Sequence, residues 1–466
     1  MSDRPIADEP GDRPRAPEPV REEARALFGL AWPLAVSLTG NAALGFVITA
    51  LVGRVDPTEL AGVAIGNGIF FTATISAAGV VFGIDPLLAQ ALGAREGARA
   101  RAILRSGLKL SLALALAAIA VVLVSPCALP LAGVDAATTD AARRFLWARA
   151  PGVLPLVVVI TLRSYLQARL VTRPIVLSMV AANLVNALLA VPLVLGDRGL
   201  AMAGLPALGL SGHGALGAGL ATSGATFAQL AVMALGFRAL EPADGEGDTT
   251  VPLGSLLRLG LPLGLTLLAE IGAFTVAGVM AGRMGPLAAS GHQVALSLAS
   301  MSFTASMAIG DATSVRVGMA VGRGDTPGAR RAGFVGLGLA TAWMSLTAAV
   351  FAFGGEAVAR LVSDRPEVIA SAAPLLLVAA AFQLFDGAQV VGAGALRGLG
   401  DTRPAQWANL VGYYAVGLPL AWFLGFRAGH GTAGLWWGLC VGLAIVAVAL
   451  VLRFERRTRT AVGRVR

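Results

Sequence analysis

Residues 259–286 read LGLPLGLTLLAEIGAFTVAGVMAGRMGP, and this stretch is apolar over nearly all of its length. A helix needs about 20 apolar residues to cross a hydrocarbon core about 30 Å thick. The apolar residues are continuous and do not alternate with polar ones, which favours a membrane helix over a strand of a β-barrel. Glu270, the one acidic residue of the stretch, lies near its middle.

The composition of the whole chain agrees with a membrane protein. Apolar residues make up 56% of the 466 residues and charged residues 14%, against about 25% charged in soluble domains. The net charge of +9 comes from basic residues spread over short loops, and this excludes a nucleic-acid-binding face. Cys127 and Cys440 lie in apolar runs and offer neither a disulfide framework nor a metal site. The polar, proline-rich residues 1–25 predict a disordered tail.

Eleven further apolar runs resemble the first, so the sequence predicts an all-α integral membrane protein with twelve transmembrane helices. The predicted spans are 27–52, 60–84, 107–132, 146–166, 175–196, 213–237, 254–281, 287–315, 332–354, 368–396, 405–427 and 432–452. The polar linker 238–252 divides them into six and six.

The two halves also match each other in sequence. Residues 30–57, LAWPLAVSLTGNAALGFVITALVGRVDP, align with 259–286 at a constant offset of 229, and Pro33 then meets Pro262. The chain is therefore a duplicated six-helix unit, with an N-terminal lobe at 26–237, a C-terminal lobe at 253–453 and a basic tail at 454–466. Each half has an even number of spans, so both halves begin on the same side of the membrane and the repeats are parallel. Transporters whose two lobes rock around a central cavity have this arrangement. This architecture predicts solute transport and no catalytic residues.

Arginine distribution predicts the orientation in the membrane. With the N-terminus inside, the tails and even-numbered loops hold twenty-five arginines and the opposite loops nine, among them Arg149. Positive charge gathers on the cytoplasmic side, so both termini are expected there.

Two acidic residues are predicted deep inside spans, Glu270 and Asp386. A charged group at such a depth costs at least about 2.5–3.5 kcal/mol and is a functional candidate by default. The alternative is a protonated carboxyl group that only bonds a neighbouring helix. The repeat places Asn41 opposite Glu270 and Leu156 opposite Asp386, so the acids belong to the C-terminal lobe alone.

Other polar and aromatic residues are weaker candidates. Asp85 and Asp311 lie near the cytoplasmic ends of long spans, and a structural role is as plausible there as a functional one. Pro33 and Pro262 each remove a backbone hydrogen bond, so at least one is expected to mark a kink that changes during transport. The remaining candidates are polar or aromatic residues inside spans that line a substrate cavity or join helices: Asn41, Asn183, Asn186, Gln293, Phe274 and Phe382.

Five motifs together carry a resemblance to a known family. They are LPLGLTLLAE at 261–270, AGRMGPLAASGHQVA at 281–295, SVRVG at 314–318, GALRGLGDTRP at 394–404 and GALGAGLAT at 214–222. With Asp386, they resemble the MATE family (multidrug and toxic compound extrusion), in particular its NorM branch, over residues 26 to 453.

The resemblance implies export of organic cations and amphipathic drugs in exchange for H⁺ or Na⁺. It also implies coupling roles for Glu270 and Asp386 and a cavity-lining role for Gln293. The sequence departs from the family at Ile48, where relatives carry an acid, and at Phe382, where NorM proteins often carry a tyrosine. The second departure removes one candidate ligand for Na⁺ and favours H⁺ slightly.

Taken together, these features predict a cation-coupled drug exporter of a bacterial cytoplasmic membrane. It is expected to be a monomer among membrane lipids, with no bound metal, no cofactor and no nucleic-acid partner. Alternatives are a flippase for lipid-linked oligosaccharides, an exporter of one metabolite, a membrane enzyme and a passive channel. A flippase is expected to have basic residues in its cavity, an enzyme a cluster of acids or metal ligands in a loop, and a channel no isolated buried acids.

Overall fold

The computed structural model describes residues 20–202, 204, 206–240 and 250–465. Twelve helical segments of the described chain are long and apolar enough to cross a membrane, the number that the sequence predicts. Residues 1–19 of the predicted tail and 241–249 of the predicted linker lie outside the described residues.

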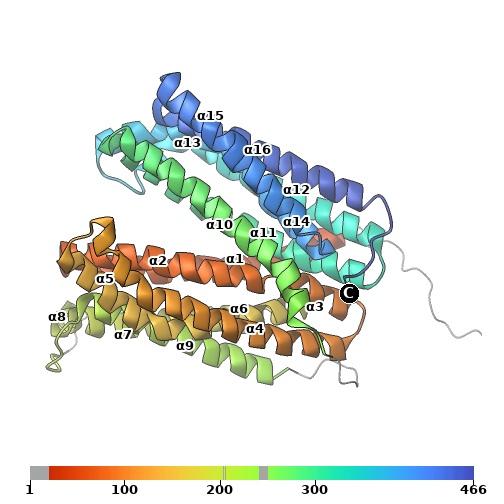
Figure 1. Ribbon diagram of the computed structural model, residues 1–466, viewed down its shortest axis with the longest axis horizontal. Coiled ribbons are helices and arrows are strands. Elements are labelled where there is room, and N and C mark those ends of the chain that lie inside the picture. Colours follow the sequence, from red (N-terminus) through yellow and green to blue (C-terminus); the bar gives the residue numbers. More distant parts are fainter. Residues whose placement is uncertain (1–19, 203, 205, 241–249, 466) are drawn as a thin grey trace, which may run out of the picture.

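The spans divide between two bundles of six (Figure 1). The N-lobe comprises α1 (Val20–Val52), α2 (Pro57–Val81) with α3 (Ile84–Gly93), α4 (Gly97–Val124), α5 (Ala136–Arg149) with α6 (Val153–Ala168), α7 (Arg173–Leu195), the short α8 (Asp197–Met202) and α9 (Gly214–Arg238). The C-lobe comprises α10 (Leu253–Arg283), α11 (Pro286–Gly322), α12 (Thr326–Ala359), α13 (Pro366–Leu399), α14 (Arg403–Asn409) with α15 (Leu418–Trp422), and α16 (Gly431–Arg457). The predicted all-α class with two six-span lobes is confirmed.

Several helices are longer than the predicted spans. α1 begins at Val20, inside the predicted tail, and the fourth span begins at Ala136, ten residues before its predicted start. The reason is that hydropathy detects only the part of a helix that lies in hydrocarbon. The first turns of α5 carry Asp140, Arg143 and Arg144, which continue the helix outside the apolar layer.

The helix breaks do not fall at the expected prolines. Pro33 and Pro262 lie inside the continuous helices α1 and α10. Breaks occur instead at Phe82–Gly83 between α2 and α3, at a 3₁₀ turn over Ala150–Gly152, and at Gly354, whose φ of −119° and ψ of 16° are not helical. A role of Pro33 or Pro262 in a moving kink stays a prediction.

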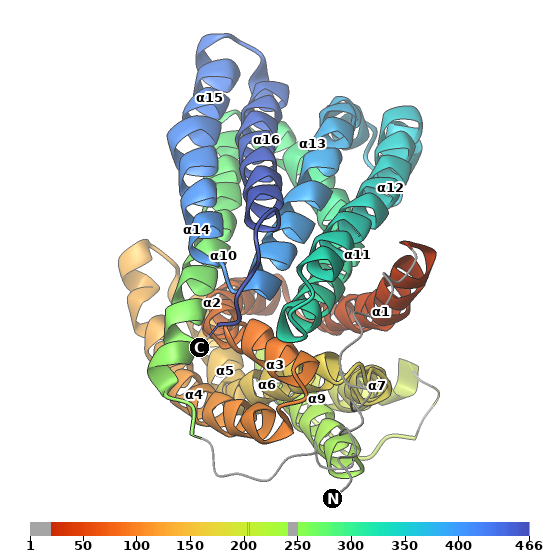
Figure 2. The ribbon, with the colours of Figure 1, turned by 90° about the vertical axis from the view of Figure 1, so that its right-hand side faces the viewer.

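The two lobes meet at one end only, here named the closed end. Figure 1 shows the lobes in contact near α3 and diverging toward the end that carries α5 and α15, here named the divergent end; Figure 2 faces the closed end. At the closed end α10 packs on α2, and α11 packs on α1 and α3. A side chain at Gly260 of α10 would place its Cβ 1.9 Å from the carbonyl oxygen of Val80. Only glycine permits this approach of two backbones.

An apolar groove of about 920 Å³ follows this junction between α2, α4 and α10. Thr72 and Ser76 are among its few polar lining residues, and both hydroxyls donate to carbonyls of their own helix. The groove therefore offers no free polar group to a solute.

Candidate functional site

The two acidic candidates come together inside the C-lobe. Glu270 projects from α10 and Asp386 from α13, and they are close enough for their charges to interact. Asp386 is 6% exposed, whereas Glu270 is half-buried and is contacted by the side chain of Gln389. Among the residues that the structure describes, no basic side chain interacts with either carboxyl group. The site is therefore a pair of acids inside the C-lobe, one buried and one half-buried, without a counter-ion among the described residues.

Unpartnered polar atoms accompany the acid pair. Tyr413 lies close enough to interact electrostatically with both carboxyl groups. In the described structure its hydroxyl has no hydrogen-bond partner. The same is true of Gln389 Oε1. A buried polar group without a partner costs about 1–3 kcal/mol, so these atoms need water, an ion or a substrate to bond.

Tyr413 owes its position to an irregular helix. The span between α14 and α15 contains a π-helical stretch, Leu410–Gly417, a form that often marks functional sites. Gly412 within it packs on α16 so closely that a Cβ would lie 2.7 Å from the carbonyl oxygen of Gly442. Nothing in the sequence marks the π-helix, so the sequence does not place Tyr413 beside the two acids.

Four aromatic residues form a cluster that reaches the acid pair through Tyr413. The ring of Phe274 is 6.0 Å from Phe382 and 6.0 Å from Tyr413, and Phe382 is 5.7 Å from Trp436. Phe382 lacks the hydroxyl that a tyrosine would supply, while Tyr413 brings one to the same cluster. Edge-to-face rings of this kind offer an apolar surface beside the acids.

The structure separates the other predicted cavity residues from this site. Asn183 of α7 donates to the carbonyl of Gly40 at 3.1 Å, so it joins α7 to α1 inside the N-lobe. Asn186 contacts the carbonyl of Leu44 in the same way, at 3.5 Å. Both residues therefore act as helix–helix contacts in this conformation.

Asn41 and Gln293 are exposed in this conformation. Gln293 has a long contact of 3.5 Å with Ser297 of its own helix. No contact links either residue to the acid pair within the described structure.

Asp85 and Asp311 belong to an ion-pair network across the closed end. Arg163 of α6 in the N-lobe bonds Asp311 of α11 in the C-lobe at 2.6 Å. Arg397 of α13 bonds the other oxygen of Asp311 at 2.7 Å and lies 3.9 Å from Asp85. All four side chains are 11–13% exposed. Of the two roles that the sequence leaves open, this geometry favours the structural one, as a link between lobes.

Arg149, Arg163 and Arg397 lie within helical spans. Arg163 and Arg397 belong to the network just described. Arg149 is buried at the end of α5, midway along the fourth span, with its guanidinium 4.2 Å above the ring of Phe70. Its Nη1 has no hydrogen-bond partner in the described structure. Arg149 was counted among the loop arginines although the predicted span 146–166 contains it, and the structure places it inside the span.

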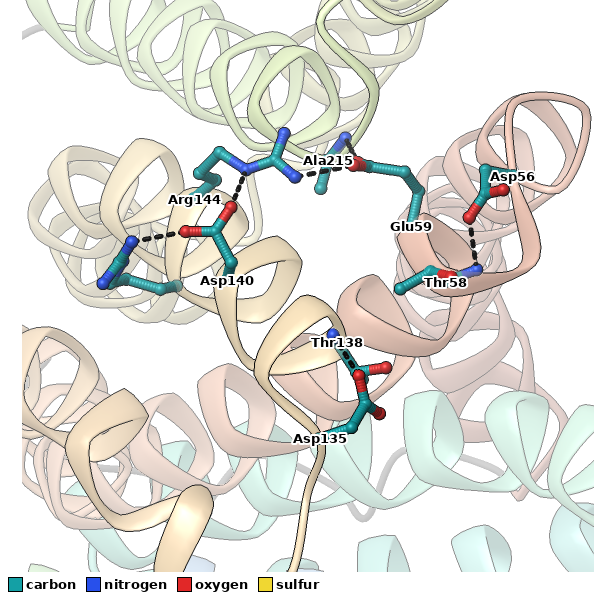
Figure 3. A network of polar contacts seen from close by, with 9 residues as sticks. Asp56, Thr58, Glu59, Asp135, Thr138, Asp140, Arg144 and Ala215 are labelled. Atoms are coloured by element: carbon teal, nitrogen blue, oxygen red, sulfur yellow. Dashed lines mark hydrogen bonds and ion pairs between the residues drawn. The ribbon is translucent and has the colours of Figure 1, made fainter.

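The divergent end of the N-lobe carries a second polar network (Figure 3). Arg144 of α5 bonds Glu59 of α2 at 2.7 Å and Asp140 at 2.9 Å, and Glu59 accepts the N–H of Ala215 at 2.6 Å. The network thus ties the ends of α2, α5 and α9 into one rigid body.

Two exposed aspartates cap helices beside this network (Figure 3). Hydrogen bonds from Thr58 hold the pKa of Asp56 below its ordinary value. The N–H of Thr138 lowers the pKa of Asp135 in the same way. Both side chains satisfy backbone groups at the starts of α2 and α5.

Comparison with known proteins identifies the family. The MatE family matches residues 33–191 and 262–423, one match in each lobe. A probable multidrug resistance protein NorM of Xanthomonas axonopodis pv. citri is 34% identical over 96% of this chain and 97% of its own length. One from Deinococcus radiodurans is 37% identical over 94% and 96%. The crystal structure of the eukaryotic MATE transporter AtDTX14 shares the fold, with a TM-score of 0.82 at 23% identity over 95% of this chain and 98% of its own. The chain therefore belongs to the MatE family, a family of membrane transporters, and to its NorM-like members.

Proposed function

We propose that this protein exports lipophilic cations and other amphipathic drugs across the bacterial cytoplasmic membrane in exchange for H⁺ or Na⁺. The relatives named above are described as multidrug resistance proteins, which supports the substrate class. The observation that carries the proposal is the pair of Glu270 and Asp386, which lie together inside the C-lobe without a basic partner among the described residues.

The acid pair provides a way to couple two solutes. Removal from water disfavours the charged form of a carboxyl group, and a second carboxylate nearby disfavours it further. A proton, a sodium ion or a cationic drug can each relieve this cost, but they compete for the same two groups. Binding of one therefore releases the other, which is what exchange across a membrane requires.

The two lobes provide the movement. The positive-inside rule assigns the closed end to the cytoplasm, so the divergent end faces outward and the conformation is the one that releases drug. Rocking of the lobes would part the closed end and admit the next substrate from the cytoplasm. In this proposal the protein works as a monomer, and both termini are cytoplasmic.

The proposed ion is H⁺, with Na⁺ as the alternative. A proton needs only the carboxyl pair, whereas Na⁺ also needs other oxygen ligands, and Phe382 supplies none. The hydroxyl of Tyr413 and the Oε1 of Gln389 have no partner in the described structure, and they are available to Na⁺. The two ions therefore have to be separated by experiment.

The test is ethidium transport in proteoliposomes, driven separately by a proton gradient and by a sodium gradient. Glu270→Gln and Asp386→Asn should each abolish gradient-driven transport while the protein still inserts and folds. Glu356→Gln is the matched control, because Glu356 is an exposed carboxyl whose ion pair among the described residues is with Arg360, which caps the same helix.

Robust proton-driven transport by the Glu270→Gln, Asp386→Asn double variant would overturn the assignment of the site. Full transport under a sodium gradient alone would overturn only the choice of ion.

A further inference from the structure

The segment that follows α16, Thr458–Val465, begins in the C-lobe. Val462 is 8% exposed and belongs to the C-lobe core. Its N–H donates to the hydroxyl of Thr326, at the start of α12, at 3.1 Å. This half of the segment is therefore fixed to the C-lobe.

Three residues later the same segment is bound to the N-lobe. The N–H of Val465 donates to Gln90 Oε1 at 2.8 Å, and its carbonyl accepts from Arg99 Nη2 at 3.0 Å. The side chain packs against a core cluster built mostly of N-lobe residues. Arg464 pairs with Glu96 at 2.5 Å. Figure 1 shows this end of the chain beside α3, at the closed end.

Gln90 of α3 is the centre of the contact. It is 2% exposed, and its Nε2 donates to the carbonyl of Gly398 in the C-lobe at 3.0 Å. The oxygen of the Gln90 amide thus bonds the tail segment, and its nitrogen bonds the C-lobe. Separation of the lobes at this end leaves the buried amide without either partner.

The turn after α13 is shaped to receive Val465. Gly400 has φ +78°, a conformation that side chains disfavour. A Cβ at Gly400 would lie 2.1 Å from a methyl carbon of Val465. The glycine therefore leaves the space that the valine fills, between Gly400 of the C-lobe and Gln90 of the N-lobe.

We propose that Thr458–Val465 is a clasp that holds the lobes together at the closed end and so favours the conformation in which the other end diverges. The clasp must release Gln90 and Arg99 each time the closed end opens. The ion pair of Arg464 with Glu96 contributes little, because both side chains are well exposed. The strength of the clasp resides in the two backbone hydrogen bonds of Val465 and its packing.

The proposal rests on the rocking of the lobes, and its test reads a distance and not transport, so it can fail independently of drug export. Spin labels are placed on two exposed residues of the divergent end, Leu131 in the N-lobe and Leu361 in the C-lobe. The background carries Cys127→Ser and Cys440→Ala. Double electron–electron resonance in lipid nanodiscs then gives the populations of the long and the short distance.

Val465→Pro removes the N–H that bonds Gln90. The ratio of short to long distance should rise about tenfold, which corresponds to about 1.4 kcal/mol. Gln90→Leu, which removes both amide bonds at similar volume, should raise the ratio at least as much. The control is Arg459→Ala, since the side chain of Arg459 bonds Glu455 of the preceding turn and no N-lobe residue within the described structure, and it should leave the ratio unchanged.

An unchanged ratio in Val465→Pro overturns the proposal, whether or not Gln90→Leu shifts it, because the tail segment would then contribute nothing. A shift of equal size in Arg459→Ala also overturns it, since the effect would not depend on the contact with the N-lobe.

Discussion

Arg163→Met should shift the protein away from the conformation described here. The bond between Arg163 and Asp311, at 2.6 Å, is one of the ionic contacts that join the two lobes at the closed end. Methionine keeps the length of the side chain and removes its charge. Asp311 keeps Arg397 as a partner at 2.7 Å, and both lie in the C-lobe, so no buried carboxylate is left uncompensated.

The size of the shift follows from the one contact that is lost. A hydrogen bond to a charged group contributes about 1.5–3 kcal/mol, and the 13% exposure of both side chains admits some screening by water. A loss of about 2 kcal/mol changes the ratio of the two conformations by about 30-fold. Asp311→Asn should have a mixed effect, because it also breaks the pair with Arg397 inside one lobe.

The label pair at Leu131 and Leu361 measures this ratio. The control is Arg323→Met, which removes an exposed arginine at the same end of the molecule and should not change the distances. A ratio within twofold of the unsubstituted protein in Arg163→Met would contradict the view that this network closes the cytoplasmic end.

Three further predictions concern packing and buried polar groups. Gly260→Ala should part the closed end, because the new Cβ would lie 1.9 Å from the carbonyl oxygen of Val80; the same labels should show the short distance, and Gly338→Ala, with open space around it, should not. Ser302→Ala should lower the free energy of unfolding by about 1–3 kcal/mol, because it deprives the buried Gln383 Oε1 of its 2.7 Å bond; thermal unfolding in detergent measures this, and an unchanged midpoint would contradict it. Arg149→Met should be neutral or stabilising in the same assay, since an apolar side chain of similar size often replaces a buried charge without loss; marked destabilisation would show that the guanidinium has a partner essential for folding.

Much of the architecture follows from the sequence alone. Twelve apolar runs and a constant offset between residues 30–57 and 259–286 predict two lobes of six helices. Such patterns are reliable because each span must satisfy its backbone hydrogen bonds within its own helix. The sequence also singles out Glu270 and Asp386 as candidates, because an isolated acid stands out in an apolar run.

Contacts between distant segments could not be predicted in this way. Arg163, Asp311 and Arg397 read as separate residues near helix ends, and only the packing of α6, α11 and α13 makes them one network. The sequence gives no sign that Arg149 is buried against Phe70, since that contact joins α5 to α2. Tyr413 became part of the acid site through a π-helical turn that no residue pattern marks.

The sequence by itself determined the number of spans, the duplication and the position of the buried acids, because those depend on local hydrophobicity along one helix. The tertiary structure alone decided which end of the lobes is closed, which charges pair across it and where the segment Thr458–Val465 docks. The physical reason is that hydrogen bonds and ion pairs act over about 3 Å, so they depend on how helices far apart in the chain are placed against one another.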